Sequence, residues 1–317
     1  MHRLIALLLL LTAHAAQAQT LWRGVSEYPA TAVPGEALTT LARLLAPAGI
    51  DLRLQFDAPD GLRSATIPDA VQSNRIEVGD AFAGALSGLD PIFQLSSLPF
   101  LATSLDDAWK LYQAAKPTYT LRFATRGQRL LYAAPWPASG IWSREALTGP
   151  ISLHGLAIRT YDAASTHALH GAGADPVLLS FADTMPRLTD GSLTAVLSSG
   201  DGGAGRRLWE FTRHFTAVGY AMPLSFATVS DAAYGALTPD QQHAVDRAGA
   251  ETERLQWQGL LRRIEDNYRT MRANGVSIEA PDPAVAAALT EAGAAVITIW
   301  ATQAGPDATA VLEAYRR

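Results

Sequence analysis

The sequence predicts an α/β protein with two lobes around a cleft and one long helix that spans both lobes. Short apolar runs alternate with amphipathic segments, the pattern of strands and helices that follow one another along a chain. A second series of this kind begins after Gly149-Pro150, and a helix too long for one lobe begins near Thr238. Ligands of such folds bind beyond the carboxyl ends of the strands, so we expect a site in the cleft.

The first series occupies the N-terminal part of the chain. Residues 21–25 and 52–56 predict strands, and each is followed by a predicted helix, at residues 36–45 and 64–72. This order predicts parallel strands with helices on the sheet faces. The next expected elements are a packed, proline-interrupted loop at 91–100, helices at 105–115 and 118–125, a strand at 130–134 and an irregular segment at 135–138.

The second series follows Pro150. Its expected strands are residues 156–159, 176–179 and 193–197, and its expected helices are residues 163–170 and 182–188. The glycine-rich residues 198–205 predict a loop that opens a helix through Phe211.

A helix start signal stands at Thr238-Pro239-Asp240-Gln241, with a capping threonine, proline at the first helical position and glutamine at the third. Apolar residues at 257, 261, 264, 268 and 271 then recur at the spacing of one helix face, and no breaker precedes Asn274-Gly275. At about 1.5 Å per residue this helix would be roughly 50 Å long, which is why we expect it to cross both lobes.

The first 18 residues have the pattern of a secretory signal peptide. Arg3 supplies the positive start, residues 4–11 form an apolar stretch too short to span a bilayer, and Ala16-Gln17-Ala18 is a small-x-small cleavage site. A buried N-terminal helix is the alternative, but no polar residue interrupts the apolar run. We therefore expect cleavage near Gln19 and a mature protein in the periplasm.

The mature protein is expected to be soluble and not anchored in a membrane. The most apolar later segment, residues 284–300, is mostly alanine and contains Glu291. The net charge of −5 argues against nucleic acid or an anionic membrane as a partner. The sequence has no cysteine, which excludes disulfides, thiol catalysis and thiolate metal sites, so a large apolar core must hold the fold.

Several segments are similar to the substrate-binding proteins of TRAP transporters. Residues 149–159, GPISLHGLAIR, resemble the family signature dLkGlKiR, and residues 171–177, GAGADPV, resemble its lGAnPvpm strand. Phe181-Ala182-Asp183 stands where the family has FsEvY. Further matches are residues 71–78 (GtiDm), 98–101 with 106–108 (lPFlf and its helix) and 237–242 (LPadvQ), so that the resemblance runs in order from about residue 24 to residue 275.

The resemblance implies the two-lobed fold of periplasmic binding proteins and a receptor, not an enzyme. Such receptors capture a solute and deliver it to a membrane permease of one small and one large subunit. We therefore expect a monomer that binds a small organic carboxylate without a cofactor. One lobe is expected to comprise residues 19–137 with about 222–260, and the other residues 138–221 with about 261–317.

Arg159 is the main candidate for ligand binding. It ends the predicted strand 156–159 and so faces the expected cleft, where a guanidinium can hold both oxygens of a carboxylate. From the residue alone, a structural salt bridge is the better interpretation. The resemblance reverses this, because it implies the carboxylate clamp of the family. It also implies that Phe181 packs against the carbon body of the ligand, with core packing as an equal alternative.

The sequence departs from the family pattern at two positions near this site. Ser198 stands where relatives carry the asparagine of GvvDGqENP, and its hydroxyl has a shorter reach than an amide. Ala138 stands where many relatives carry a second arginine. These departures argue against the dicarboxylate or sialic-acid ligands that are usual in the family.

Aromatic residues are expected to replace the lost polar contacts. Tyr28 follows the first strand, Trp136 lies near Ala138, and Tyr220 lies near the crossover between lobes, so together they predict a flatter, more apolar pocket. For Trp142 we expect ordinary core packing. Glu27 either binds a ligand hydroxyl or amine, or is a solvated loop charge.

Other functions find less support in the sequence. His154, His167 and His170 have a loosely metal-like spacing, but no carboxylate or cysteine completes a site, so we expect surface histidines. The glycine-rich residues 198–205 lack the Lys-Ser/Thr of a phosphate-binding loop. A secreted hydrolase is disfavoured, because the sequence has no G-x-S-x-G, H-E-x-x-H or Cys-His pattern. A binding protein that feeds a sensory receptor remains the alternative to transport.

Overall fold

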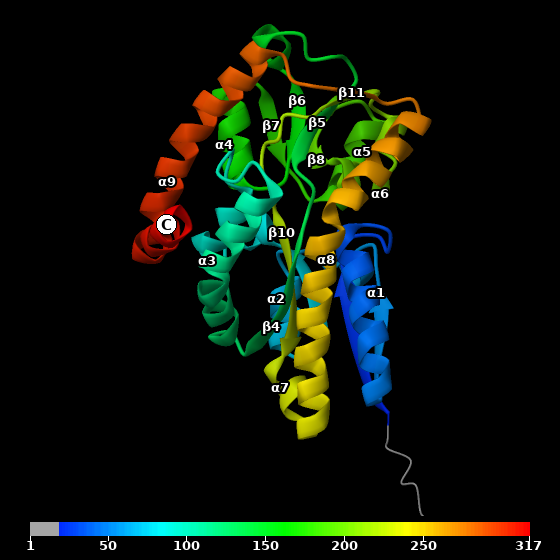
Figure 1. Cartoon of the computed structure of the whole chain (residues 1–317). Coiled ribbons are helices and arrows are strands. Elements are labelled where there is room, and N and C mark those ends of the chain that lie inside the picture. The colour runs from blue at the N-terminus through cyan, green and yellow to red at the C-terminus, as the bar shows by residue number, and fades with distance from the viewer. Residues whose placement is uncertain (1–18) are drawn as a thin grey trace, which may run out of the picture.

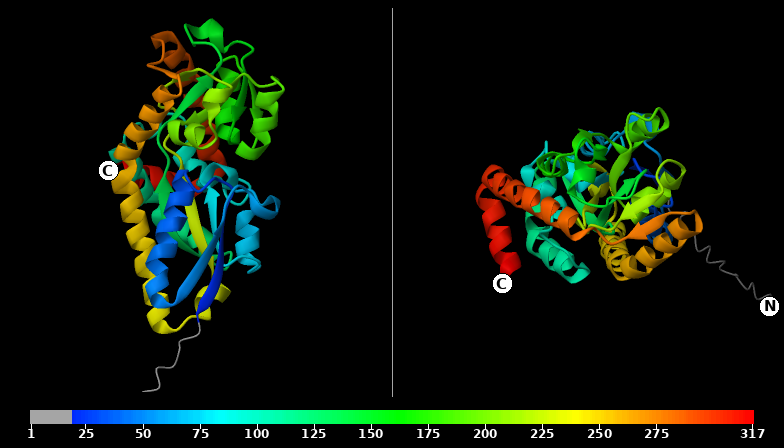
Figure 2. Two further views of the ribbon diagram at one scale, coloured as in Figure 1. Left: turned by 90° about the vertical axis from the view of Figure 1, so that its right-hand side faces the viewer. Right: turned by 90° about the horizontal axis from the view of Figure 1, so that it is seen from above.

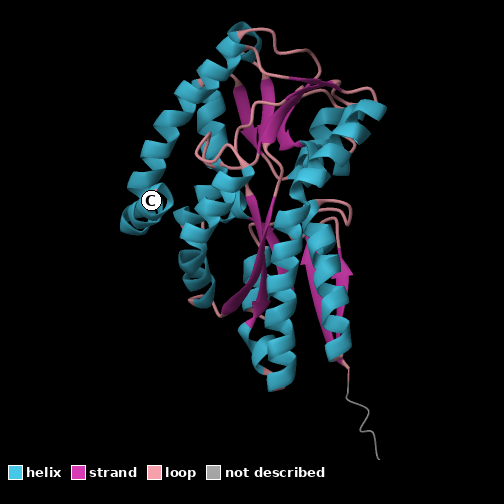
Figure 3. Cartoon of the chain, viewed as in Figure 1, coloured by secondary structure: helices cyan, strands magenta, loops and turns pink. Residues whose placement is uncertain are grey.

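Two β-sheets form the centres of two lobes in the computed structural model, which describes residues 19–317 (Figure 1). The first sheet has the strand order β2-β1-β3-β10-β4, and the second has the order β11-β9-β5-β8-β6-β7. Helices flank the strands of both sheets (Figure 3). The predicted two-lobed α/β fold is therefore confirmed. The expected signal peptide, residues 1–18, lies outside the described residues.

The first sheet carries the elements of the N-terminal series. These are β1 (Thr20–Ser26), α1 (Val33–Leu45), β2 (Ile50–Gln55), α2 (Ile67–Gln72), β3 (Val78–Phe82), α3 (Leu105–Ala124), β4 (Gln128–Pro135), β10 (Leu224–Ser230) and α7 (Asp231–Gly235). β1 pairs in parallel with β2 and β3, as predicted. β10 pairs antiparallel with both β3 and β4, because the chain enters it from the other lobe.

The second sheet carries the second series. Its elements are β5 (Ser139–Ser143), β6 (Ala157–Thr160), α4 (Ala163–Gly171), β7 (Asp175–Leu178), α5 (Phe181–Thr189), β8 (Ala195–Ser199), α6 (Gly200–Gly205), β9 (His214–Thr216) and β11 (Ser277–Glu279). β6 is parallel to β7 and β8, and β5 is antiparallel to β8 and β9. Each sheet thus contains one antiparallel strand next to a crossover between the lobes.

Two chain segments that cross between the sheets pair with each other. Residues 136–138 lead from β4 to β5, and residues 217–223 lead from β9 to β10. The amide of Trp136 donates to the carbonyl of Pro223 at 2.8 Å, and the amide of Ser139 donates to the carbonyl of Ala221 at 2.8 Å. This backbone pairing holds the two crossing segments side by side between the lobes.

The long helix α8 (Pro239–Ala273) runs along both lobes (Figure 2). Thr238 caps its first turn, and Gln241 completes the predicted capping box. The helix packs on α1 and β4 in the first lobe and on α6 in the second. Its predicted start, its end at Asn274 and its span across the lobes are all confirmed.

Helix α9 (Pro283–Arg316) also touches both lobes. It packs on α4 and α3, and the indole of Trp300 donates to the carbonyl of Pro91 at 2.7 Å. A kink at Gly305-Pro306 breaks it, with Gly305 at φ 69°. Among residues 19–317, α9 is the one helix long and apolar enough to cross a membrane by length and composition. Helix α9 contains Glu291, and the expectation that the mature protein is not anchored in a membrane stays a prediction.

Three predicted segments take a different form. Residues 105–124 form one helix, α3, although Pro117 stands inside it, because packing of its buried face on β4 and α9 offsets the free energy lost with one backbone hydrogen bond. Residues 91–97 form a 3₁₀ helix within the packed segment that was expected to be a loop. The glycine-rich segment is the helix α6, and only a short turn at 208–210 follows it.

Glycine is needed in α6 because the helix lies close to other groups of the second lobe. A Cβ on Gly203 would overlap the indole of Trp142, and a Cβ on Gly202 would come within 2.5 Å of the Ser198 hydroxyl. The glycines that suggested a loop therefore permit a helix to pack directly against β8 and β5. Trp142 is fully buried there, as expected of a core residue.

Candidate functional site

A cavity opens between the lobes where the strands of both sheets end. Arg159 lies near the end of β6, Ser198 and Ser199 end β8, and Phe82 ends β3. Eleven residues line this cavity: Tyr28, Phe82, Trp136, Ser139, Arg159, Tyr161, Phe181, Ser198, Ser199, Gly202 and Pro223. An outer cavity adjoins this space and shares Tyr28, Phe82, Arg159, Tyr161 and Phe181 with it. We call the first cavity the chamber and the adjoining outer cavity the vestibule.

The guanidinium of Arg159 is held by hydrogen bonds within its own lobe, and one edge of it keeps N–H groups that bind no protein acceptor within residues 19–317. The side chain is 3% exposed, and its Nε donates to the carbonyl of Leu179 at 2.9 Å while Nη1 donates to the carbonyl of Leu197 at 3.1 Å. A guanidinium has five N–H donors. Within residues 19–317, both N–H groups of Nη2 and one of Nη1 have no protein acceptor. The backbone of β8 and of the loop after β7 thus orients the group for a bidentate anion.

No carboxylate of residues 19–317 pairs with the Arg159 guanidinium. Burial lowers the pKa of Arg159, and the nearby Tyr28 and Glu27 oppose that shift only in part. A buried cation without a counterion is costly in a medium of low dielectric constant. An anion that entered the chamber would remove this cost, so the chamber favours a negatively charged ligand.

Aromatic rings make up the walls around the guanidinium. The Cζ of Arg159 lies 4.9 Å from the centroid of the Phe181 ring, within cation–π range. Tyr28 and Trp136 have ring centroids 4.9 Å apart and form a second wall, while the indole of Trp136 donates to the Ser225 hydroxyl at 3.0 Å. The chamber therefore suits a small anion with a flat carbon body.

Hydroxyl groups supply the remaining polar surface of the chamber. Ser139, Tyr161 and Ser198 all line it, and the Tyr161 hydroxyl donates to that of Ser139 at 3.3 Å. The Ser199 hydroxyl is already used, because it accepts from the amide of Gly202 and caps α6. Hydroxyls both donate and accept, so this wall can hold a neutral carbonyl or amide group.

The structure brings five of the seven predicted site residues together in the chamber: Arg159, Phe181, Ser198, Tyr28 and Trp136. Glu27 lines the vestibule instead. Its side chain is buried and accepts from the amide of Ser64 at 2.8 Å, so the solvated-charge interpretation is wrong. As ligand contacts, all seven residues stay predictions.

Tyr220 lines neither cavity. It is fully buried at the crossover, with its ring edge-on to Phe100 and to Tyr161. It therefore stands behind Tyr161 and supports the chamber wall from outside. Ala138, the position of the missing second arginine, is half-buried in the same crossover.

Sequence reasoning missed Phe82, Ser139 and Tyr161. Phe82 and Ser139 belong to β3 and β5, two strands that were not predicted. Tyr161 stands two residues after Arg159, so the spacing along a strand end was a signal that could have found it. The three histidines 154, 167 and 170 are exposed, and no group of three or more metal-binding side chains occurs in the part of the chain that the structure describes.

The chain matches known proteins over most of its length. The family model of the bacterial extracellular solute-binding proteins of family 7 matches residues 62–303. A comparison with curated proteins gave no match.

Three solved structures are similar in fold and sequence. DctP6 of Bordetella pertussis is 30% identical, with a TM-score of 0.89, 94% of this chain covered and 99% of that chain. DctP7 of the same organism is 28% identical, with a TM-score of 0.90 and coverage of 94% and 100%. A TRAP solute-binding protein from a marine metagenome is 26% identical, with a TM-score of 0.88 and coverage of 94% and 99%. The first two are extracytoplasmic solute receptors that bind pyroglutamic acid, and the third is specific for pyroglutamate.

Proposed function

The chain belongs to the bacterial extracellular solute-binding proteins of family 7, and from this we propose that its solute is a small cyclic monocarboxylate, with pyroglutamate as the first candidate. Arg159 anchors the carboxylate in the interlobe chamber. The observation that carries the proposal is the buried guanidinium with one unused edge and no carboxylate partner in residues 19–317. The proposal is also supported by the three receptors named above, which bind pyroglutamate or pyroglutamic acid and are 26–30% identical in sequence to this chain.

The chemistry of pyroglutamate suits the chamber. It carries one carboxylate, and the site offers one guanidinium, with Ala138 where a second arginine would stand. Its lactam presents one N–H donor and one carbonyl acceptor, which the hydroxyls of Ser139, Tyr161 and Ser198 can satisfy. Its five-membered ring is flat enough for the aromatic walls of the chamber. A dicarboxylate would leave its second charge among aromatic rings, at a large cost.

The finer points of the function are proposals as well. The mature receptor begins after cleavage near Gln19, works as a monomer in the periplasm and delivers its ligand unchanged to a TRAP-type permease of one small and one large subunit. The lobes comprise residues 19–137 with about 222–260 and residues 138–221 with about 261–317. The membership of the strands in two separate sheets supports this division.

A thermal-shift panel tests the ligand class, since a ligand that binds only the folded state raises the unfolding temperature. The panel contains L-pyroglutamate, succinate and 2-pyrrolidinone, the last being the same ring without a carboxylate. We expect stabilisation by pyroglutamate alone, and recovery of unchanged pyroglutamate from the protein by NMR. Stabilisation by 2-pyrrolidinone but not by L-pyroglutamate would overturn the carboxylate assignment.

A further inference from the structure

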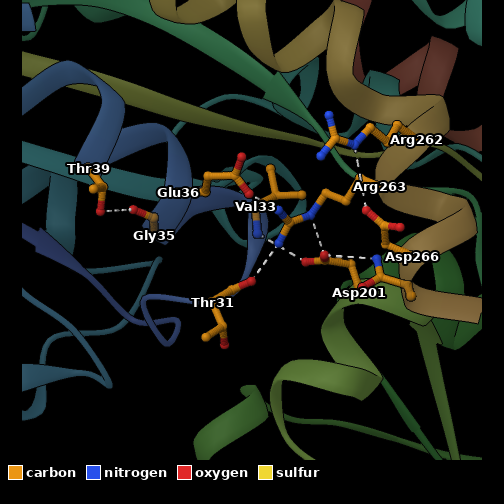
Figure 4. Close-up of polar contacts among 10 residues, drawn as sticks. Thr31, Val33, Gly35, Glu36, Thr39, Asp201, Arg262, Arg263 and Asp266 are labelled. Carbon is orange, nitrogen blue, oxygen red and sulfur yellow. Dashed lines mark hydrogen bonds and ion pairs between the residues drawn. The ribbon is translucent and has the colours of Figure 1, made fainter. Parts of the chain in front are cut away.

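Asp201 joins the second lobe to the first through polar contacts with Val33 and Arg263 (Figure 4). It belongs to α6, yet its Oδ1 accepts from the backbone amide of Val33, the first residue of α1, at 3.0 Å. Its side chain is 1% exposed. The contact therefore links the two lobes through a buried charge.

Asp201 replaces a missing cap of α1. The N-cap residue Ala32 has no side chain that can accept a hydrogen bond, and Pro34 in the first turn has no amide to donate. A carboxylate at a helix N-terminus satisfies a free N–H group and interacts favourably with the helix dipole. Helix α1 thus receives its cap from the other lobe.

The other oxygen of Asp201 binds α8 near the point where that helix passes between the lobes. Oδ2 accepts from Nε of Arg263, and from Nδ2 of Asn267 at 3.0 Å. Arg263 also donates from Nη2 to the carbonyl of Thr31 at 2.5 Å, and it pairs with Glu36 of α1. The Asp201 carboxylate therefore has donors from α1 and α8 at once, and Arg263 repeats the link to α1.

The same segment carries part of the chamber wall. Ser198, Ser199 and Gly202 line the chamber, and Asp201 stands between them in the chain. The close packing of Gly202 and Gly203 seats α6 firmly on the second lobe. Asp201 can reach Val33 only when this wall is near the first lobe, which is also the position that closes the chamber over a ligand.

We propose that Asp201 is a positioning residue that latches the lobes in the closed conformation and thereby strengthens ligand retention. The proposal rests on the proposed receptor function. Other contacts between the lobes are more exposed, such as Arg206–Asp57 at 2.9 Å and Arg63–Asp183 at 3.5 Å. Exposed ion pairs contribute little, so the buried Asp201 carboxylate is the contact on which closure depends most. Opening the lobes would uncap α1 and separate Asp201 from Val33.

The quantity to measure is the closed fraction, the share of molecules whose two lobes are closed. Single-molecule energy transfer reports it between dyes on Gln72→Cys of α2 and Arg187→Cys of α5. The sequence has no other cysteine, and both side chains are exposed, one in each lobe. The test variant is Asp201→Asn, which keeps the shape but loses the charge. The matched control is Glu36→Gln, which removes the exposed partner of the same arginine. Each variant is titrated with L-pyroglutamate.

We expect Asp201→Asn to lower the closed fraction at every subsaturating concentration and to weaken pyroglutamate binding about 10- to 100-fold, the usual range of a coupling between sites. The loss should lie in a faster dissociation rate, with Glu36→Gln near wild type. A different outcome is that pyroglutamate leaves the closed fraction of wild type unchanged while ligand-free Asp201→Asn is closed less often than ligand-free wild type. In that case the ligand assignment fails and the latch stands. If Asp201→Asn keeps the wild-type closed fraction at all concentrations, zero included, the latch is refuted.

Discussion

Replacing Arg159 should remove most of the affinity for a carboxylate without removing the cavity. Two of its N–H groups bind the carbonyls of Leu179 and Leu197, and its side chain lines the chamber with no acceptor for the other donors among residues 19–317. A charge-assisted hydrogen bond contributes about 1.5–3 kcal/mol. Two such bonds to one carboxylate amount to about 3–6 kcal/mol, so Arg159→Ala should raise the Kd for pyroglutamate by about 10²- to 10⁴-fold.

Arg159→Lys separates charge from geometry. Lysine keeps the positive charge but cannot offer two parallel donors to a carboxylate while also binding both backbone carbonyls. We expect an intermediate loss, roughly 10- to 10²-fold, because about one charge-assisted hydrogen bond is retained. The two lost backbone contacts also lower the stability of the fold. The unfolding temperature of each ligand-free variant, measured by circular dichroism, shows the size of that loss in stability.

A thermodynamic cycle on the ligand side isolates the carboxylate contact. Calorimetry gives the Kd of L-pyroglutamate and of 2-pyrrolidinone for wild type and for Arg159→Ala. We expect wild type to prefer pyroglutamate strongly and Arg159→Ala to bind both compounds alike. If Arg159→Ala still distinguished them by the wild-type factor, the carboxylate would lie elsewhere and Arg159 would be a structural residue only.

Two further predictions concern buried carboxylates outside the chamber. Burial raises the pKa of Asp80 well above its usual value, so the group favours folding when protonated, and this contribution is lost as the pH rises above about 4, the pKa in the unfolded chain. Asp80→Asn should therefore raise the free energy of unfolding by roughly 1–3 kcal/mol at pH 7 and by less at pH 4, measured by urea denaturation; an equal effect at both pH values would contradict this. Glu253 accepts from the hydroxyl of Tyr112, from Nζ of Lys116 at 2.6 Å and from the amide of Ala133 at 3.1 Å, so Glu253→Ala should cost about 2–4 kcal/mol in the same assay. The exposed Glu251→Ala is its control and should cost less than about 1 kcal/mol; similar losses in the two variants would refute the role of burial.

The alternation of strands and helices was readable because it follows from local patterns. Strands β1, β2, β6, β7 and β8 and the helices α1, α2, α4 and α5 have apolar periods that a short window detects. Strand β10, LSFATVS, was missed because both of its faces are buried, so serine and threonine stand where an alternating pattern would need apolar residues. Helix α6 was missed because its stability comes from packing against Trp142 and β8, not from helix propensity.

The candidate site was only partly predictable from the sequence. The family resemblance pointed to Arg159 and Phe181, since each lies in a motif that is continuous in the chain. The burial of Glu27 depends on the amide of Ser64, 37 residues away, which no local pattern reveals. Tyr220 was placed correctly at the crossover, but packing on Phe100 and Tyr161 keeps it out of the chamber. Long-range contacts of this kind decide which residues face a ligand.

The most direct test of the account is a crystal structure of the mature protein with L-pyroglutamate. We predict that the carboxylate binds the N–H groups of the Arg159 guanidinium that have no acceptor within residues 19–317, that the ring lies between Phe181 and the Tyr28–Trp136 wall, and that the lactam contacts the serine and tyrosine hydroxyls. A ligand bound outside the chamber, or one whose carboxylate contacts a group other than Arg159, would contradict it.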